Sequence, residues 1–115
     1  MTEDKKHTVR KGKEDPRINI IKKNTGKNLE IALEGRLDTT TAPELEKELK
    51  ADMEGAETLV LDFEKLDYIS SAGLRVLLSA HKVMNSRGGM KVIHVNEIVQ
   101  EVFEVTGFAD ILTIE

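Results

Sequence analysis

The stretch Tyr68-Ile69-Ser70-Ser71-Ala72-Gly73-Leu74-Arg75-Val76-Leu77-Leu78 decides how this chain is interpreted. It follows an apolar run at residues 58–63 and opens an amphipathic segment that continues to Arg87. This pattern predicts a strand, a loop and then a helix that begins at two serines. Because the first N–H groups of a helix have no partner within the helix, an anion is well tolerated there. The stretch therefore predicts a helix start that is either capped by a serine or modified with phosphate on one.

Apolar spacing on both sides of this stretch predicts alternating strands and helices. Turn residues at 24–28 join the first two strands into a hairpin, and a threonine run with Pro43 in the first turn opens a helix. In the last helix we expect Ile98, Val102 and Val105 to face inward. The predicted strands cover residues 18–21, 29–37, 58–63, 90–95 and 111–114, and the predicted helices cover residues 39–55, 71–86 and 97–106.

These elements define an α/β fold in the order β-β-α-β-α-β-α-β. Strands separated by helices need crossover connections, so we expect a mixed sheet of four to five strands with helices packed against it. Residues 1–16 mix five basic with four acidic side chains and contain almost no large apolar one. They cannot offset their ordering entropy by burial, so we expect a mobile charged tail followed by one domain over residues 17–115.

Composition excludes several classes of function. The net charge of −4 argues against nonspecific nucleic-acid binding, and the absence of cysteine excludes disulfides, thiolate chemistry and zinc–sulfur sites. No apolar stretch approaches the roughly 20 residues of a membrane span, so we expect a cytoplasmic protein without membrane insertion. His7, His81 and His94 show no spacing that indicates a catalytic arrangement. We therefore expect no enzyme activity, no cofactor and no metal site.

Three motifs stand at fixed places in this order of elements. They are Glu34-Gly35-Arg36-Leu37-Asp38, Ile69-Ser70-Ser71-Ala72-Gly73-Leu74 and Val105-Thr106-Gly107-Phe108. Together with the element order they resemble the STAS domain family, and within it the bacterial anti-sigma factor antagonists. The resemblance covers residues 17–115.

The resemblance implies a partner-switching function. Such an antagonist binds a kinase-type anti-sigma factor when its serine is bare, which releases the sigma factor. The anti-sigma factor phosphorylates that serine and ends the interaction, and a metal-dependent serine phosphatase restores the active form. The family pattern Asp-Ser-x-Gly-Leu places the phosphorylated serine on Ser71. The acidic position before it holds Ser70 here, which leaves Ser70 as a second candidate acceptor.

We expect the partner to contact Asp38, Ser70, Ser71, Ala72, Gly73 and Arg75. Asp38 matches an acidic residue that the family places beside the phosphorylation loop, but an aspartate before a threonine run also initiates turns. Gly73 either lets the helix approach the sheet or leaves room for a partner. Of the two serines, Ser70 is the better candidate for helix capping.

Two other functions remain open from the sequence. A STAS module can also serve as the interaction subunit of a transport or signalling assembly. A small-molecule or nucleotide binder is the third possibility, although no lining pattern for a pocket favours it.

Overall fold

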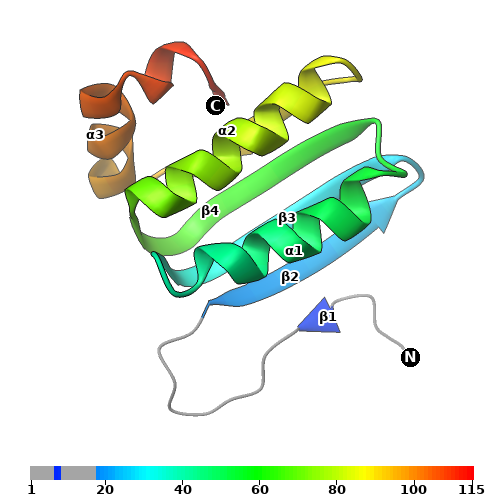
Figure 1. Ribbon diagram of the computed structural model, residues 1–115, viewed down its shortest axis with the longest axis horizontal. Coiled ribbons are helices and arrows are strands. Elements are labelled where there is room, and N and C mark those ends of the chain that lie inside the picture. The colour runs from blue at the N-terminus through cyan, green and yellow to red at the C-terminus, as the bar shows by residue number, and fades with distance from the viewer. Residues whose placement is uncertain (1–6, 9–17) are drawn as a thin grey trace.

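The computed structural model describes residues 7–8 and 18–115, and across these residues six strands form one sheet (Figure 1). The sheet has the order β1-β2-β3-β4-β5-β6, so the strands lie side by side in chain order. The strands are β1 (His7–Thr8), β2 (Asn19–Thr25), β3 (Asn28–Leu37), β4 (Thr58–Ile69), β5 (Met90–Ile93) and β6 (Thr113–Ile114). The helices are α1 (Ala42–Met53), α2 (Ser71–Asn85), α3 (Glu97–Thr106) and the short 3-10 helix η1 (Phe108–Asp110).

The predicted α/β class and the predicted order of elements are confirmed from β2 onward. The two-residue β1 pairs antiparallel with β2 and adds an edge strand that the sequence pattern did not indicate. The remainder of the predicted mobile tail, residues 1–6 and 9–16, lies outside the described residues. No helix in residues 18–115 combines the length and apolar character needed to cross a bilayer.

The sheet combines one hairpin with a series of parallel strands. β2 and β3 pair antiparallel around a tight turn at Gly26, which has φ of +64°. From β3 onward each strand pairs parallel with the next, because a helix crosses over between them. Figure 1 shows α1 and α2 side by side over the same face of the sheet. Alternate buried residues of the strands, such as Leu29, Ile31 and Leu33 in β3, form the core beneath the helices.

β4 is twice as long as the sequence predicted, at 12 residues rather than the run at 58–63. Beyond Phe63 the charged side chains end the continuous apolar run, but Leu66 and Ile69 remain buried and keep the strand in the sheet. Two irregularities in the β3–β4 register accompany this continuation. Leu37 and Ile69 pair at its far end, so β3 and β4 finish together.

The buried face of α3 differs from the prediction. Val99 and Phe103 are fully buried, whereas Ile98 is 61% and Val105 is 79% exposed, so the expected inward orientation is wrong for Ile98 and Val105. Val102, the third residue of the expected stripe, is partly buried and packs against the core. The helix carries two adjacent apolar stripes, and the one with the larger side chain is buried. Phe103 packs near Phe63 of β4, with ring centroids 6.4 Å apart.

Substitutions on the buried and the exposed side of α3 should lower the free energy of unfolding by very different amounts. Phe103→Ala removes a fully buried ring and should lower the free energy of unfolding by about 3–5 kcal/mol. Val105→Ala on the same helix should change it by less than about 0.5 kcal/mol, because that side chain is largely exposed. Urea denaturation of both variants measures the difference. Equal losses would contradict the observed orientation of α3.

Candidate functional site

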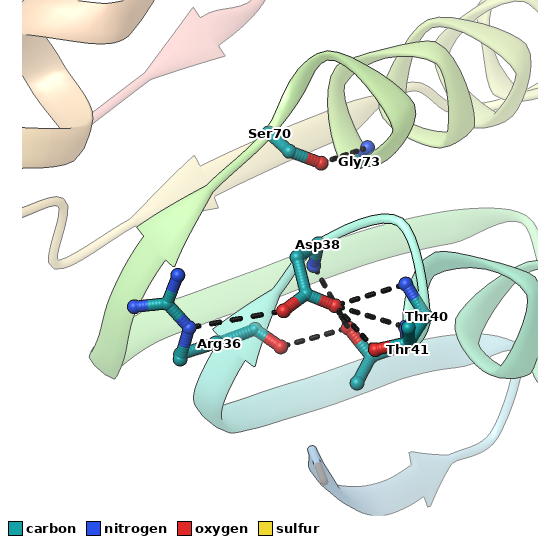
Figure 2. A network of polar contacts seen from close by, with 6 residues as sticks. All are labelled: Arg36, Asp38, Thr40, Thr41, Ser70 and Gly73. Carbon is teal, nitrogen blue, oxygen red and sulfur yellow. Dashed lines mark hydrogen bonds and ion pairs between the residues drawn. The ribbon is translucent and has the colours of Figure 1, made fainter. Parts of the chain in front are cut away.

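The candidate site lies where the parallel strands β3 and β4 end together. The N–H of Ser70 donates to the carbonyl of Leu37 at 2.9 Å, which ties the start of α2 to the end of β3. Figure 2 shows Asp38 and Ser70 emerging from these neighbouring strand ends. The proximity of Asp38 to the serine loop, on which the sequence interpretation depends, is therefore present in the fold.

Ser70 occupies the N-cap position of α2. Its backbone is extended (φ −102°, ψ 177°), and its hydroxyl oxygen accepts a hydrogen bond from the N–H of Gly73 at 3.4 Å. Its carbonyl accepts from the N–H of Leu74 at 2.9 Å. Ser70 thus performs the capping that was expected of it.

Ser71 is the first residue of α2, and it is exposed. Its hydroxyl makes no hydrogen bond to any residue in the described part of the chain. The first turn of α2 contains no acidic side chain that would repel a bound anion. The arrangement therefore presents a solvent-accessible hydroxyl at the positive end of a helix dipole.

Asp38 organises the turn between β3 and α1. Its Oδ1 accepts from the N–H and the hydroxyl of Thr40, at 3.0 and 2.8 Å, and from the N–H of Thr41 at 3.1 Å. Its Oδ2 lies 3.7 Å from Nε of Arg36, whose guanidinium stacks on the ring of Tyr68. The Thr40 hydroxyl is the main reason that the pKa of Asp38 lies below its ordinary value. The turn-initiating interpretation of Asp38 is therefore confirmed, and its contact with a partner stays a prediction.

The threonine run opens α1 as expected, but no threonine side chain caps the helix. Thr41 holds the N-cap position, but its hydroxyl makes no capping bond. It donates to the carbonyl of Arg36 and accepts from the N–H of Asp38, both at 2.8 Å. Thr41 is 2% exposed, and these buried bonds hold the turn closed. The sequence placed the threonine run at the start of the helix, but it did not indicate that the Thr41 hydroxyl bonds back to Arg36 and Asp38.

Gly73 lies on the buried side of α2, against the ends of both strands. A Cβ added there would meet Cγ of Leu37 at 2.7 Å and Cγ1 of Ile69 at 3.0 Å. Of the two interpretations of this glycine, close approach of the helix to the sheet is the one the structure supports. On the other side of the helix Arg75 is exposed, and Ala72 is half-buried.

An open groove of about 410 Å³ runs between the first halves of α1 and α2. Its lining is mixed apolar and polar, and Arg75 and Glu46 line it from opposite helices. The lining residues are Thr39, Ala42, Pro43, Glu46, Ala72, Arg75, Val76 and Ser79. Sequence reasoning missed this groove because it depends on how the two helices pack, and only Ala72 and Arg75 among its residues were expected at the site.

His94 belongs to a separate cluster at the end of β5. Its Nδ1 lies 2.9 Å from Oδ1 of Asp62, which is the main reason that the pKa of His94 is raised. Asp62 also accepts from the N–H of Glu64 at 3.0 Å. Among residues 18–115, these three side chains form the one group whose donor atoms could hold a metal ion, all within 4.8 Å of one another. Asp62 precedes Ser70 by eight residues on β4, and the groove includes none of the three.

Gly73→Ala should destabilise the fold by about 1–3 kcal/mol, because the added methyl group overlaps the side chains of Leu37 and Ile69. Gly55→Ala is the matched control. Its Cβ would meet nothing within 4 Å, so that variant should be unchanged or slightly more stable. Thermal and urea unfolding of the two variants measure the contrast. An unchanged stability of Gly73→Ala would show that α2 can move away from the strand ends without cost.

Asp38 should contribute stability that depends on pH. Its pKa is lowered in the folded state, so the ionised carboxylate stabilises the fold above the unfolded value of about 3.9, and this contribution is lost as pH falls through the folded value. The difference in unfolding free energy between wild type and Asp38→Asn should therefore be full at about pH 6 and shrink below about pH 4. Urea denaturation across this range measures it.

Asp67→Asn is the control for the bonds of Asp38. Asp67 is exposed on the same strand as Tyr68, and its carboxylate bonds to no described residue. At about pH 6 this variant should change the unfolding free energy by less than about 0.5 kcal/mol, because it removes no bond. A constant gap for Asp38→Asn would contradict the role of the Asp38 bonds in the turn.

Comparison with known proteins identifies the family. Residues 19–115 match the model of the STAS domain. BtrV of Bordetella bronchiseptica, which has been assigned as an anti-sigma factor antagonist, is 42% identical over 84 residues, covering 71% of this chain and 72% of BtrV. The anti-sigma-B factor antagonist of Bacillus subtilis is 28% identical over 98 residues, covering 84% of this chain and 90% of that protein.

Solved structures support the same fold. The anti-sigma factor antagonist SpoIIAA in its unphosphorylated form superposes with a TM-score of 0.73 at 18% identity, covering 84% of this chain and 87% of SpoIIAA. The phosphorylated form of SpoIIAA from Bacillus gives a TM-score of 0.66 at 17% identity, covering 84% of this chain and 90% of SpoIIAA. The resemblance drawn from the sequence motifs is thus confirmed: this chain belongs to the STAS domain family, and its relatives include anti-sigma factor antagonists.

Proposed function

We propose that this protein is an anti-sigma factor antagonist that is switched off by phosphorylation of Ser71. The observation that carries the proposal is that the two adjacent serines are bonded differently. Ser70 caps α2, which leaves the hydroxyl of Ser71 exposed and without a hydrogen-bond partner in the described residues. Because Ser70 already caps the helix, capping does not account for Ser71.

The partner in this proposal is a kinase-type anti-sigma factor. It binds the surface formed by the Asp38 turn, the start of α2 and the adjoining groove, and this binding releases the sigma factor in the cytoplasm. The partner then transfers the γ-phosphoryl group of ATP to Oγ of Ser71, which loses its proton, and ADP leaves. A metal-dependent serine phosphatase hydrolyses the phosphate ester and restores the bare serine. The nucleotide and the metal ions belong to these partners, so this chain acts without catalysis or a cofactor of its own.

Phosphate on Ser71 should leave the fold intact. It adds about 1.5–2 negative charges at the N-terminus of α2, where unpaired N–H groups and the helix dipole favour an anion. The exposed hydroxyl makes no packing contact that modification would remove. The phosphate therefore acts on the docking surface through its bulk, its hydration and its repulsion from acidic groups such as Asp38.

Three variants test the proposal when each is used to capture partners from the native cell, with identification by mass spectrometry. Wild type and Ser71→Ala should capture a serine kinase, whereas Ser71→Asp should bind it at least about 100-fold more weakly. Ser70→Ala is the matched control. It should lose about 1 kcal/mol of stability with its cap and, as one uncharged contact of the docking surface, weaken capture of the kinase far less than Ser71→Asp does.

Two results would contradict the proposal. Equal capture of one partner by wild type, Ser71→Ala and Ser71→Asp would show that Ser71 does not control binding. Capture of a transporter ATPase in place of a kinase would favour the role of a subunit in a transport assembly.

A further inference from the structure

Arg75 lies one helical turn beyond Ser71 on α2. Residues four apart on a helix are neighbours on its surface, with Cβ atoms about 6 Å apart. Arg75 is exposed, and it lines the groove between α1 and α2. Its side chain can therefore extend toward either of two places, the groove or the hydroxyl of Ser71.

The charge of Arg75 is uncommitted within the described part of the chain. No ion pair or hydrogen bond joins its guanidinium to residues 18–115. The first turn of α2 has no acidic side chain that would compete for it. Across the groove, the carboxylate of Glu46 lies 3.7 Å from Nζ of Lys50 on its own helix.

The start of α2 provides only part of what a phosphate on Ser71 would need. The N–H of Gly73 already donates to the hydroxyl of Ser70, so it is not available to a phosphate. A phosphate has three acceptor oxygens, and guanidinium groups bind them in a bidentate manner. Among the residues of α2 up to Leu78, Arg75 is the one with a cationic side chain.

We propose that Arg75 is the intramolecular ligand of phosphate on Ser71, and that phosphorylation withdraws its guanidinium from the groove. In the bare protein, Arg75 offers a positive charge at the rim of the groove to an acidic group of the partner. In the phosphorylated protein, that charge is paired with the phosphate. The switch then has two components, an added anion and a cation removed from the docking surface. This inference rests on the proposed function, because it assumes that Ser71 is the residue modified.

The first test needs no partner protein. Phosphoserine is introduced genetically at position 71, and the second pKa of the phosphate is measured by ³¹P NMR titration. A nearby guanidinium stabilises the dianion, so Arg75→Gln should raise this pKa by about 0.3–0.7 unit. Arg75→Lys should keep part of the effect. Lys82→Gln, which removes a cation from the last turn of the same helix, is the matched control and should leave the pKa unchanged.

An unchanged pKa in Arg75→Gln would overturn the proposal. Because Arg75 is exposed, the variant should fold normally, and circular dichroism checks this. The titration gives the same result whether or not the protein binds a kinase. A failure of the proposed function therefore remains distinguishable from a failure of the contact between Arg75 and the phosphate.

The second test is a thermodynamic cycle with the purified kinase partner. Arg75→Gln should weaken binding of the bare protein about 10-fold, since it removes the charge offered at the groove. It should weaken binding of the phosphorylated protein much less, because that charge is already paired. The ratio of the two dissociation constants should therefore shrink at least about threefold. Equal weakening of both forms would overturn the role of Arg75 in the switch.

Discussion

The site depends on the junction between the ends of β3 and β4. The hydrogen bond from the N–H of Ser70 to the carbonyl of Leu37 continues the parallel ladder for one residue beyond the paired Leu37 and Ile69. The helix that follows then packs directly on this junction, because Gly73 has no side chain to hold it away. The same two contacts place the Asp38 turn beside the start of α2. The carboxyl ends of neighbouring parallel strands are a common place for a binding site in α/β proteins, and here they bring together residues far apart in sequence.

Stability and regulation are separated across the two sides of α2. The side facing the sheet carries Gly73, Leu74 and Leu77, which are buried. The side facing solvent carries Ser71 and Arg75, which make no packing contact on which the fold depends. A charge added to the solvent side therefore destabilises the folded state little. It becomes unfavourable only when a partner covers it, because the charge must then lose its hydration. Under the proposed function, this separation would let phosphate on Ser71 change partner binding without changing the fold.

The sequence predicted the order of elements because apolar spacing and turn residues are local signals. It also predicted the capping role of Ser70. It did not predict the second half of β4, because Leu66 and Ile69 are buried there three residues apart, without strand alternation, and pairing with β3 through an irregular register keeps them in the sheet. It placed Ile98 and Val105 of α3 inward, because two apolar stripes are present on this helix, whereas in the fold Val99 and Phe103 are buried and Phe103 packs near Phe63. Likewise, the bonding of Thr41 and the groove between α1 and α2 arise from tertiary contacts, which the spacing of apolar residues in the sequence does not reveal.

Two aspartates that accept several hydrogen bonds show why geometry, and not residue type, identifies the site. Asp62, on β4, is bonded to His94 just after β5 and to the N–H of Glu64. Asp38 is equally bonded within its own turn, yet its turn is joined to the start of a helix that presents an unbonded hydroxyl. An anion added at that hydroxyl is stabilised by the helix dipole in the free protein. It would oppose binding of a partner, because the partner surface would remove water from the anion. In the proposed switch, the free energy of regulation would therefore come from the partner interface, and the bonded turn at Asp38 would hold that surface in one shape.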